Sequence, residues 1–254
     1  MRNRIEKSKV PHIISDNIGI MVVLLILCII VSLATDKFLT SGNIISVLRQ
    51  ISINTYIALG MTLIIILGHI DLTVGAVVAM CGTLTVGFIV NQGLPVELAI
   101  IGGVLLGVLF GFINGVIVST FKVPSFIITM AMMNVANGIA YVYSGGQSTR
   151  ITDGFFISIG TGYLFSLIPL PVLYMILLII VISFLLVKTR FGVYVYAIGG
   201  NREAARLSGI PIRKIEIIVF TLSGLLSAFA GLVLASRMYS GQPSDGHGNE
   251  MDAN

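Results

Sequence analysis

Long apolar stretches alternate with short polar connections along this chain, and the pattern predicts an all-α polytopic membrane bundle. A helix needs about 20 apolar residues to cross the hydrocarbon core of a bilayer. The first stretch has this span length, which favours an uncleaved helix over a signal peptide. We predict seven spans, at residues 17–35, 51–67, 72–90, 98–121, 123–143, 164–187 and 217–236.

Breaks between the spans predict the domain organisation. Pro124 separates the fourth and fifth spans, and Pro171 marks where the sixth helix starts or kinks. The stretch 144–163 is rich in Gly, Ser and Thr and is interpreted as an exterior loop. We expect one membrane domain over residues 1–243, with an inner loop at 188–216 and a polar tail at 244–254.

Composition supports the membrane assignment and argues against nucleic acid as a partner. Hydrophobic residues make up 56% of the 254 residues and charged residues only 10%, whereas soluble domains carry about 25% charged residues. The net charge is +4, but the basic residues flank the apolar runs, where they set orientation, and form no patch. Cys28 and Cys81 lie inside apolar runs, which indicates buried small residues, not a disulfide or a metal pair.

The distribution of lysine and arginine predicts a cytosolic N-terminus, because positive residues concentrate in cytoplasmic connections. Most of them lie in the N-terminal segment, at Lys122 and in the loop 188–216, all on one side of the predicted membrane. The other side holds Lys37, Arg49, Arg150 and Arg237.

A polar break with the sequence Gly68, His69, Ile70 and Asp71 joins the second and third spans. A carboxylate near hydrocarbon is costly and indicates a functional site, but Asp71 could equally cap the N-terminus of the next helix. The two roles are compatible, because helix termini that face a cavity bind polar solutes in transporters. His69 lacks a second ligand at a useful spacing, so no metal site is expected; both side chains are candidates for the pathway.

Glycines recur every four residues in the fourth span, at Gly103, Gly107, Gly111 and Gly115. They form one stripe along a helix face, and small residues let a neighbouring helix approach closely. The stripe therefore predicts helix packing.

Three amides inside or beside the apolar spans, expected to be buried, are further candidates for the pathway: Asn114, Asn134 and Asn137. In a membrane bundle such side chains either bond to neighbouring helices or line a polar path, and bonding is the simpler role.

The loop 188–216 contains a short helix with clear start and stop signals. Asn201 is a good N-cap, Gly209 suits the position after the helix, and Pro211 prevents continuation. Leu207 follows Glu203 by four residues, so an apolar and an acidic side chain share one face. Such a helix could lie on lipid headgroups or bind another protein.

The residues Glu203, Ala204, Ala205 and Gly209 resemble the coupling-helix signature of permease subunits of ATP-binding-cassette importers. The sequences at 68–75 and 111–115 narrow the resemblance to permeases of the ribose type. It covers nearly the whole chain, from Phe38 to Pro243.

The resemblance implies a permease of the prokaryotic cytoplasmic membrane that imports a monosaccharide, with a ribose-like pentose favoured. Two copies of the permease would form the pathway, lined near Asp71 and Asn114, and an extracytoplasmic binding protein would deliver the sugar. A cytosolic ATPase subunit would dock on Glu203, Ala204, Ala205, Arg206 and Gly209. The chain carries no Gly-x-x-x-x-Gly-Lys-Ser/Thr phosphate loop, so the partner would bind ATP and this chain would not be an enzyme.

Two features depart from the ribose-type pattern. His69 stands where the family usually has a second glycine, which leaves the identity of the sugar open. The family also continues with further apolar spans where this chain has the polar residues 244–254, so a shortened chain is expected.

Two other classes of function remain as alternatives. A secondary carrier driven by an ion gradient places acids within its spans, and Asp71 is its one candidate. An intramembrane enzyme needs paired carboxylates, an activated nucleophile or metal ligands. His69 and Asp71 would point in nearly opposite directions on a regular helix, so catalysis is disfavoured.

Overall fold

The computed structural model describes residues 10–121 and 123–244, with the backbone alone for residues 10–17. The described chain divides between Val47 and Leu48 into two compact units. Three parts of the chain lie outside the described residues: residues 1–9, Lys122 and residues 245–254. The basic residues of the N-terminal segment, Lys122 and most of the expected polar tail fall there.

The first unit contains α1 (Val10–Ala34) and the start of α2 (Ser41–Ile66). From Ile18 onward most side chains of α1 are exposed, and they are almost entirely apolar. The turn that follows α1 is closed by Asn43, whose Nδ2 donates to the carbonyl oxygen of Phe38 at 2.7 Å. An exposed apolar helix of this kind suits lipid better than water.

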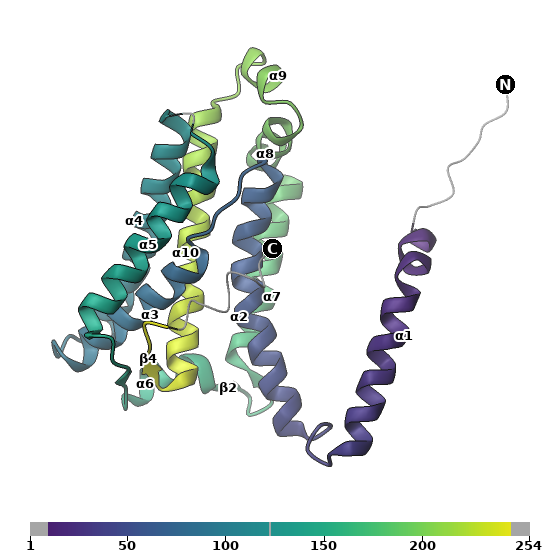
Figure 1. Cartoon of the computed structure of the whole chain (residues 1–254), viewed down its shortest axis with the longest axis vertical. Helices are drawn as coiled ribbons and strands as arrows, with labels where there is room; N and C mark the ends of the chain where they lie inside the picture. The colour runs from purple at the N-terminus through teal and green to yellow at the C-terminus, as the bar shows by residue number, and fades with distance from the viewer. Residues whose placement is uncertain (1–9, 122, 245–254) are drawn as a thin grey trace. The chain divides into compact units, whose positions relative to one another are not determined.

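The second unit is a helical bundle that begins with the rest of α2 (Figure 1). Its other helices are α3 (Val74–Val90), α4 (Val96–Phe121), α5 (Ser125–Ser144), α6 (Gly154–Thr161), α7 (Leu170–Lys188), α8 (Arg190–Gly200), α9 (Arg202–Leu207) and α10 (Ile212–Met238). In Figure 1, α8 and α9 lie at one end of this bundle, and α6 lies at the other.

Two short antiparallel ribbons complete the second unit. β1 (Thr149–Arg150) pairs with β4 (Ser240–Gly241), with Thr149 opposite Gly241. β2 (Tyr163–Leu164) pairs with β3 (Ile168–Pro169), with Tyr163 opposite Pro169. Both ribbons are too small to alter the class of the fold.

The prediction of an all-α membrane bundle is confirmed. In the described residues, five helices are long and apolar enough to cross a membrane: α2, α4, α5, α7 and α10. The segment Ile18–Ala34 of α1 and the helix α3 are also apolar but shorter. Each of the seven predicted spans overlaps one of these helices.

The third predicted span, 72–90, differs from the others in its surroundings. Its helix α3 has 17 residues, a length of about 25 Å at 1.5 Å per residue. Side chains from Val74 to Gly87 are buried. Other parts of the bundle therefore surround α3, which the hydropathy pattern could not distinguish from a span that faces lipid.

The prediction that the sixth helix starts near Pro171 is confirmed, because α7 starts at Leu170 with Pro171 in its first turn, where a missing N–H costs nothing. The predicted start of that span at residue 164 was wrong, because residues 164–169 lie in the β2–β3 ribbon. Both predicted loops also contain helix. The loop at 144–163 contains α6, which Asp153 caps by accepting from the Phe156 N–H at 2.9 Å. The loop at 188–216 contains α8, capped by Thr189, and the first turn of α10.

Backbone contact between α4 and α10 forms what we call the glycine seam, made by Gly107, Gly111, Gly115 and Gly224. A Cβ atom at Gly107 would lie 2.6 Å from the Gly224 carbonyl oxygen, and one at Gly111 would overlap the Phe220 carbonyl oxygen. The fourth member of the predicted stripe, Gly103, faces Thr85 of α3 instead. Any side chain in the seam would push the two helices apart.

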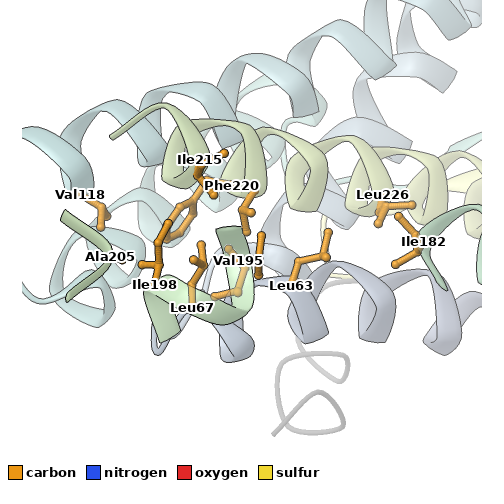
Figure 2. Packing of buried hydrophobic residues seen from close by; sticks show 12 residues of the cluster. Leu63, Leu67, Val118, Ile182, Val195, Ile198, Ala205, Ile215, Phe220 and Leu226 are labelled. Carbon is orange, nitrogen blue, oxygen red and sulfur yellow. The ribbon is translucent and has the colours of Figure 1, made fainter. Parts of the chain in front are cut away.

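A buried apolar cluster joins α8 and α9 to the bundle. Figure 2 shows its residues from α2, α4, α7, α8, α9 and α10. They are Leu63, Leu67, Val118, Ile182, Val195, Ile198, Ala205, Ile215, Val219, Phe220 and Leu226, together with Ile64.

Candidate functional site

The helix α9 is built from local signals at both of its ends. At the start, Asn201 Oδ1 accepts from the Ala204 N–H at 2.9 Å, which confirms Asn201 as the N-cap. At the end, the Gly209 N–H donates to Arg206 and the Ile210 N–H donates to Ala205, at 3.0 and 3.1 Å. These two bonds are the Schellman motif, and Gly209 takes the left-handed conformation that it requires, with φ of 78°.

One apolar side chain packs α9 against the rest of the bundle. Ala205 is only 4% exposed and belongs to the buried cluster with Ile198 and Ile215. Glu203, Arg206 and the 77% exposed Leu207 point away from that cluster. Of the four signature residues, Ala205 therefore packs against the bundle of its own chain. The other three, Glu203, Ala204 and Gly209, are exposed.

The exposed face of α9 carries an ion pair next to an apolar side chain. The Arg206 guanidinium donates to both oxygens of Glu203, at 2.5 and 3.1 Å. This hydrogen bond lowers the pKa of the Glu203 carboxyl below its ordinary value. An exposed pair with Leu207 beside it is suited to binding another protein, because it combines charge with apolar surface.

The second part of the site is the polar bend, residues 67–73, which joins α2 to α3. Gly68 ends α2 with φ of 80°, and the N–H groups of Gly68 and His69 donate to Ile65 and Ile64 in a second Schellman motif. Beyond it, the Ile70 N–H donates to Ser125 Oγ at 3.0 Å. The first turn of α5 therefore holds the backbone of the bend in place.

Asp71 lies at the centre of a buried network of polar side chains. It is 3% exposed. Its Oδ1 accepts from the N–H and hydroxyl of Thr73, at 2.9 and 2.5 Å, and its Oδ2 accepts from the Ser223 hydroxyl of α10 at 3.2 Å. The suggestion that Asp71 caps α3 was wrong, because Thr73 occupies the cap position and Asp71 forms a turn before it.

Asn114 of α4 extends this network. The side chain is fully buried, and its Nδ2 donates to Thr73 Oγ1 at 3.0 Å. Its Oδ1 makes no hydrogen bond to the described protein atoms, and neither do the hydroxyls of Thr83 and Thr85 in α3. Buried polar atoms without partners are costly in a bundle core, so a polar solute or water would be stabilised beside the Asn114 Oδ1.

The predicted amides on α5 lie elsewhere. Asn134 is exposed and its Nδ2 donates to the Met130 carbonyl oxygen of its own helix at 2.9 Å. Asn137 is half-buried on the same helix. The structure thus joins Asp71 and Asn114 in one network and leaves the two α5 amides outside it.

The structure also reveals a second network that contains His69. His69 Nε2 lies 3.0 Å from Oε1 of Glu216, a fully buried carboxylate in α10, and the Arg202 guanidinium contacts both oxygens of the same carboxylate. Glu216 is the last residue of the predicted loop 188–216, where its sequence position alone gave it no role. The signal that could have distinguished it is an acid followed at once by the apolar residues of a helix.

Two pockets adjoin these networks. One, of about 500 Å³, is lined by the bend and by the start of α5, including His69, Ser125 and Arg202. The other, of about 660 Å³, is lined by the α9 region, including Arg202, Arg206 and Arg213. Among the described residues, Arg202 is the one side chain that lines both.

Comparisons with known proteins agree on one kind of relative. Residues 43–254 match the family described as branched-chain amino acid transport system / permease component. The ribose import permease protein RbsC of Haemophilus influenzae is 44% identical over 91% of this chain and 72% of its own length. That of Bacillus subtilis is 43% identical over 94% and 74%.

A third relative carries a different sugar in its name. The L-arabinose ABC transporter permease protein AraH of Azospirillum brasilense is 40% identical over 92% of this chain and 68% of its own length. No solved structure matches the chain.

The apolar bundle with its buried polar break defines a multi-pass membrane permease component. Within that class, the chain belongs to the ribose permease family of ATP-binding-cassette permeases.

Proposed function

We propose that this chain is the membrane-spanning subunit of an ATP-binding-cassette importer that carries a monosaccharide across the cytoplasmic membrane. A separate ATPase subunit drives the transport and binds the ATP. The observation that carries the proposal is α9, a helix attached through Ala205 and both caps that exposes Glu203, Arg206 and Leu207 at one end of the bundle.

The proposed pathway runs past the polar bend. Asp71 and Asn114 come together in a buried network that includes the unpartnered Asn114 Oδ1. Hydroxyl groups of a sugar both donate and accept hydrogen bonds, so they can satisfy such atoms in turn. His69 lies beside this path, whereas Asn134 and Asn137 lie on α5 outside the network.

The proposed assembly contains two copies of this chain, two ATPase subunits and an extracytoplasmic sugar-binding protein. The N-terminus and α9 lie in the cytosol, since the basic residues concentrate on that side. Ribose is the favoured cargo because two of the named relatives are ribose import permeases, and arabinose is the first alternative.

Replacing Glu203 with Lys tests the coupling. The side chain is exposed, so the substitution leaves the fold intact but reverses the charge offered to the ATPase. We expect uptake of labelled ribose by cells that contain the complete transporter to fall at least about tenfold, a coupling loss within the usual range for linked sites. The amount of permease in the membrane, measured by immunoblot, should stay unchanged.

Glu97→Lys is the matched control, because Glu97 is an exposed acid in the first turn of α4. It should retain wild-type uptake. Unchanged uptake in Glu203→Lys would contradict the coupling role of α9. Ribose and arabinose are then compared as competitors to identify the cargo.

A further inference from the structure

Glu216 is a fully buried carboxylate that lies just beyond the first turn of α10. It is not part of the Asp71 network. A buried charge is tolerated only where it is paired and hydrogen-bonded. Both of its oxygens are in fact engaged: Oε1 by His69 and Arg202, and Oε2 by Arg202 at 3.3 Å.

The two partners come from the two parts of the functional site. Arg202 is the first residue of α9, and its side chain is 51% exposed. His69 lies in the polar bend, two residues before Asp71, and its side chain is 16% exposed. One carboxylate therefore joins the exposed helix to the segment that carries Asp71.

Packing joins the same two regions. Gly199 at the end of α8 lies so close to α2 that a Cβ atom there would overlap the carbonyl oxygen of Ile66, the last residue before the bend. Leu67 of the bend and Ala205 of α9 belong to the same buried cluster, with Ile198 between them in Figure 2. A movement of α9 would therefore reach the bend through rigid contacts as well as through the charges.

The two pockets also meet the link between α9 and the bend. Arg202 lines both the pocket at the bend and the pocket at α9. One residue therefore borders both spaces, and its hydrogen bonds to Glu216 fix its position there.

We propose that Glu216 is a positioning residue for transport, which links α9 to the polar bend so that displacement of α9 moves His69 and Asp71. This inference rests on the proposed function, because it needs an ATPase subunit that moves α9. A purely structural ion pair would behave differently: removing one partner of a buried pair lowers the stability and so the amount of folded transporter, but it would not change how much ATP each sugar requires.

The test uses the complete transporter reconstituted in proteoliposomes, with its ATPase subunit and its binding protein. ATP hydrolysis and uptake of labelled ribose are measured in the same vesicles for wild type and for Glu216→Gln, which keeps the shape but removes the charge. We expect hydrolysis within about twofold of wild type and uptake lower by about tenfold, so the ATP consumed per sugar rises about fivefold or more.

Three further variants keep the outcome interpretable. Arg202→Gln removes the charge of the half-exposed partner and should raise the same ratio. Glu216→Asp keeps the charge and should restore part of the coupling. Glu97→Gln, at an exposed acid of α4, should leave the ratio at the wild-type value.

An unchanged ratio in both Glu216→Gln and Arg202→Gln would overturn the proposal, as would a parallel loss of hydrolysis and uptake. Either result would leave the proposed function intact, provided that ATP hydrolysis drives sugar uptake in the wild-type complex. If wild-type hydrolysis and uptake were independent of each other, the proposed function itself would fail, and the role of Glu216 with it.

Discussion

The α9 region and the glycine seam hold their helices in opposite ways. α9 has six residues, and an isolated helix of that length is unstable in water. Its shape depends on groups that are present: the Asn201 cap, the Gly209 turn and the buried methyl group of Ala205. The seam depends on groups that are absent, since the backbones of α4 and α10 touch where no side chain intervenes.

This difference explains how the two regions can serve different purposes. The exposed face of α9 can change its side chains without disturbing the fold, because its caps and its anchor lie elsewhere on the helix. In the seam every added atom meets backbone, so the helices α4 and α10 are fixed relative to each other. The seam thus forms a rigid support, and α9 is a small element attached to one end of it.

Adding a side chain within the glycine seam should cause the largest loss of stability among the variants that test this comparison. In Gly111→Leu the new side chain would overlap the Phe220 carbonyl oxygen of α10. We expect a loss of about 3 kcal/mol of stability, the upper part of the range for overpacked cores. The measurement is the midpoint of thermal unfolding of the purified permease in detergent, together with the yield of monodisperse protein.

Gly138→Leu provides the control for added volume in a transmembrane helix. A Cβ atom at Gly138 of α5 meets nothing within 4 Å, so this variant should unfold at nearly the wild-type temperature. Equal unfolding midpoints for the two variants would show that α4 and α10 do not touch as described.

A smaller effect is expected where the seam borders the buried polar network. Ser223→Ala removes the donor to Asp71 Oδ2 and leaves that buried oxygen unpaired, which costs about 1–3 kcal/mol. Thr221→Ala is the matched control, because Thr221 donates to the Ile217 carbonyl oxygen of its own helix. Thermal unfolding should separate the two variants, and a greater loss in Thr221→Ala would contradict the described network.

The features predicted from sequence are those that local chemistry decides. Asn201 and Gly209 mark the ends of α9 because caps involve only neighbouring backbone groups. The spacing of Gly107, Gly111 and Gly115 identified a face for close packing, although nothing in it specified α10 as the partner.

The missed features depend on residues far apart in the chain. Ser223 and Asp71 are 152 positions apart, and Glu216 and His69 are 147 positions apart, so no local pattern connects them. The burial of α3 was also unpredictable, because helices that face lipid and helices that face protein have the same apolar composition in a membrane.

The mildest prediction concerns the end of α9. In Gly209→Ala no atom lies within 4 Å of the new Cβ, so the cost comes entirely from the positive φ of 78°. That cost, about 1 kcal/mol, should make the Ile210 amide, which donates to Ala205, exchange its hydrogen about fivefold faster. Gly200→Ala also adds a methyl group in open space, but Gly200 ends α8 without a positive φ, so the same amide should keep its protection. Should the two variants exchange at equal rates, the turn after α9 would not be what holds its exposed face in position, and that role would fall to Ala205 and to the Arg202–Glu216 pair.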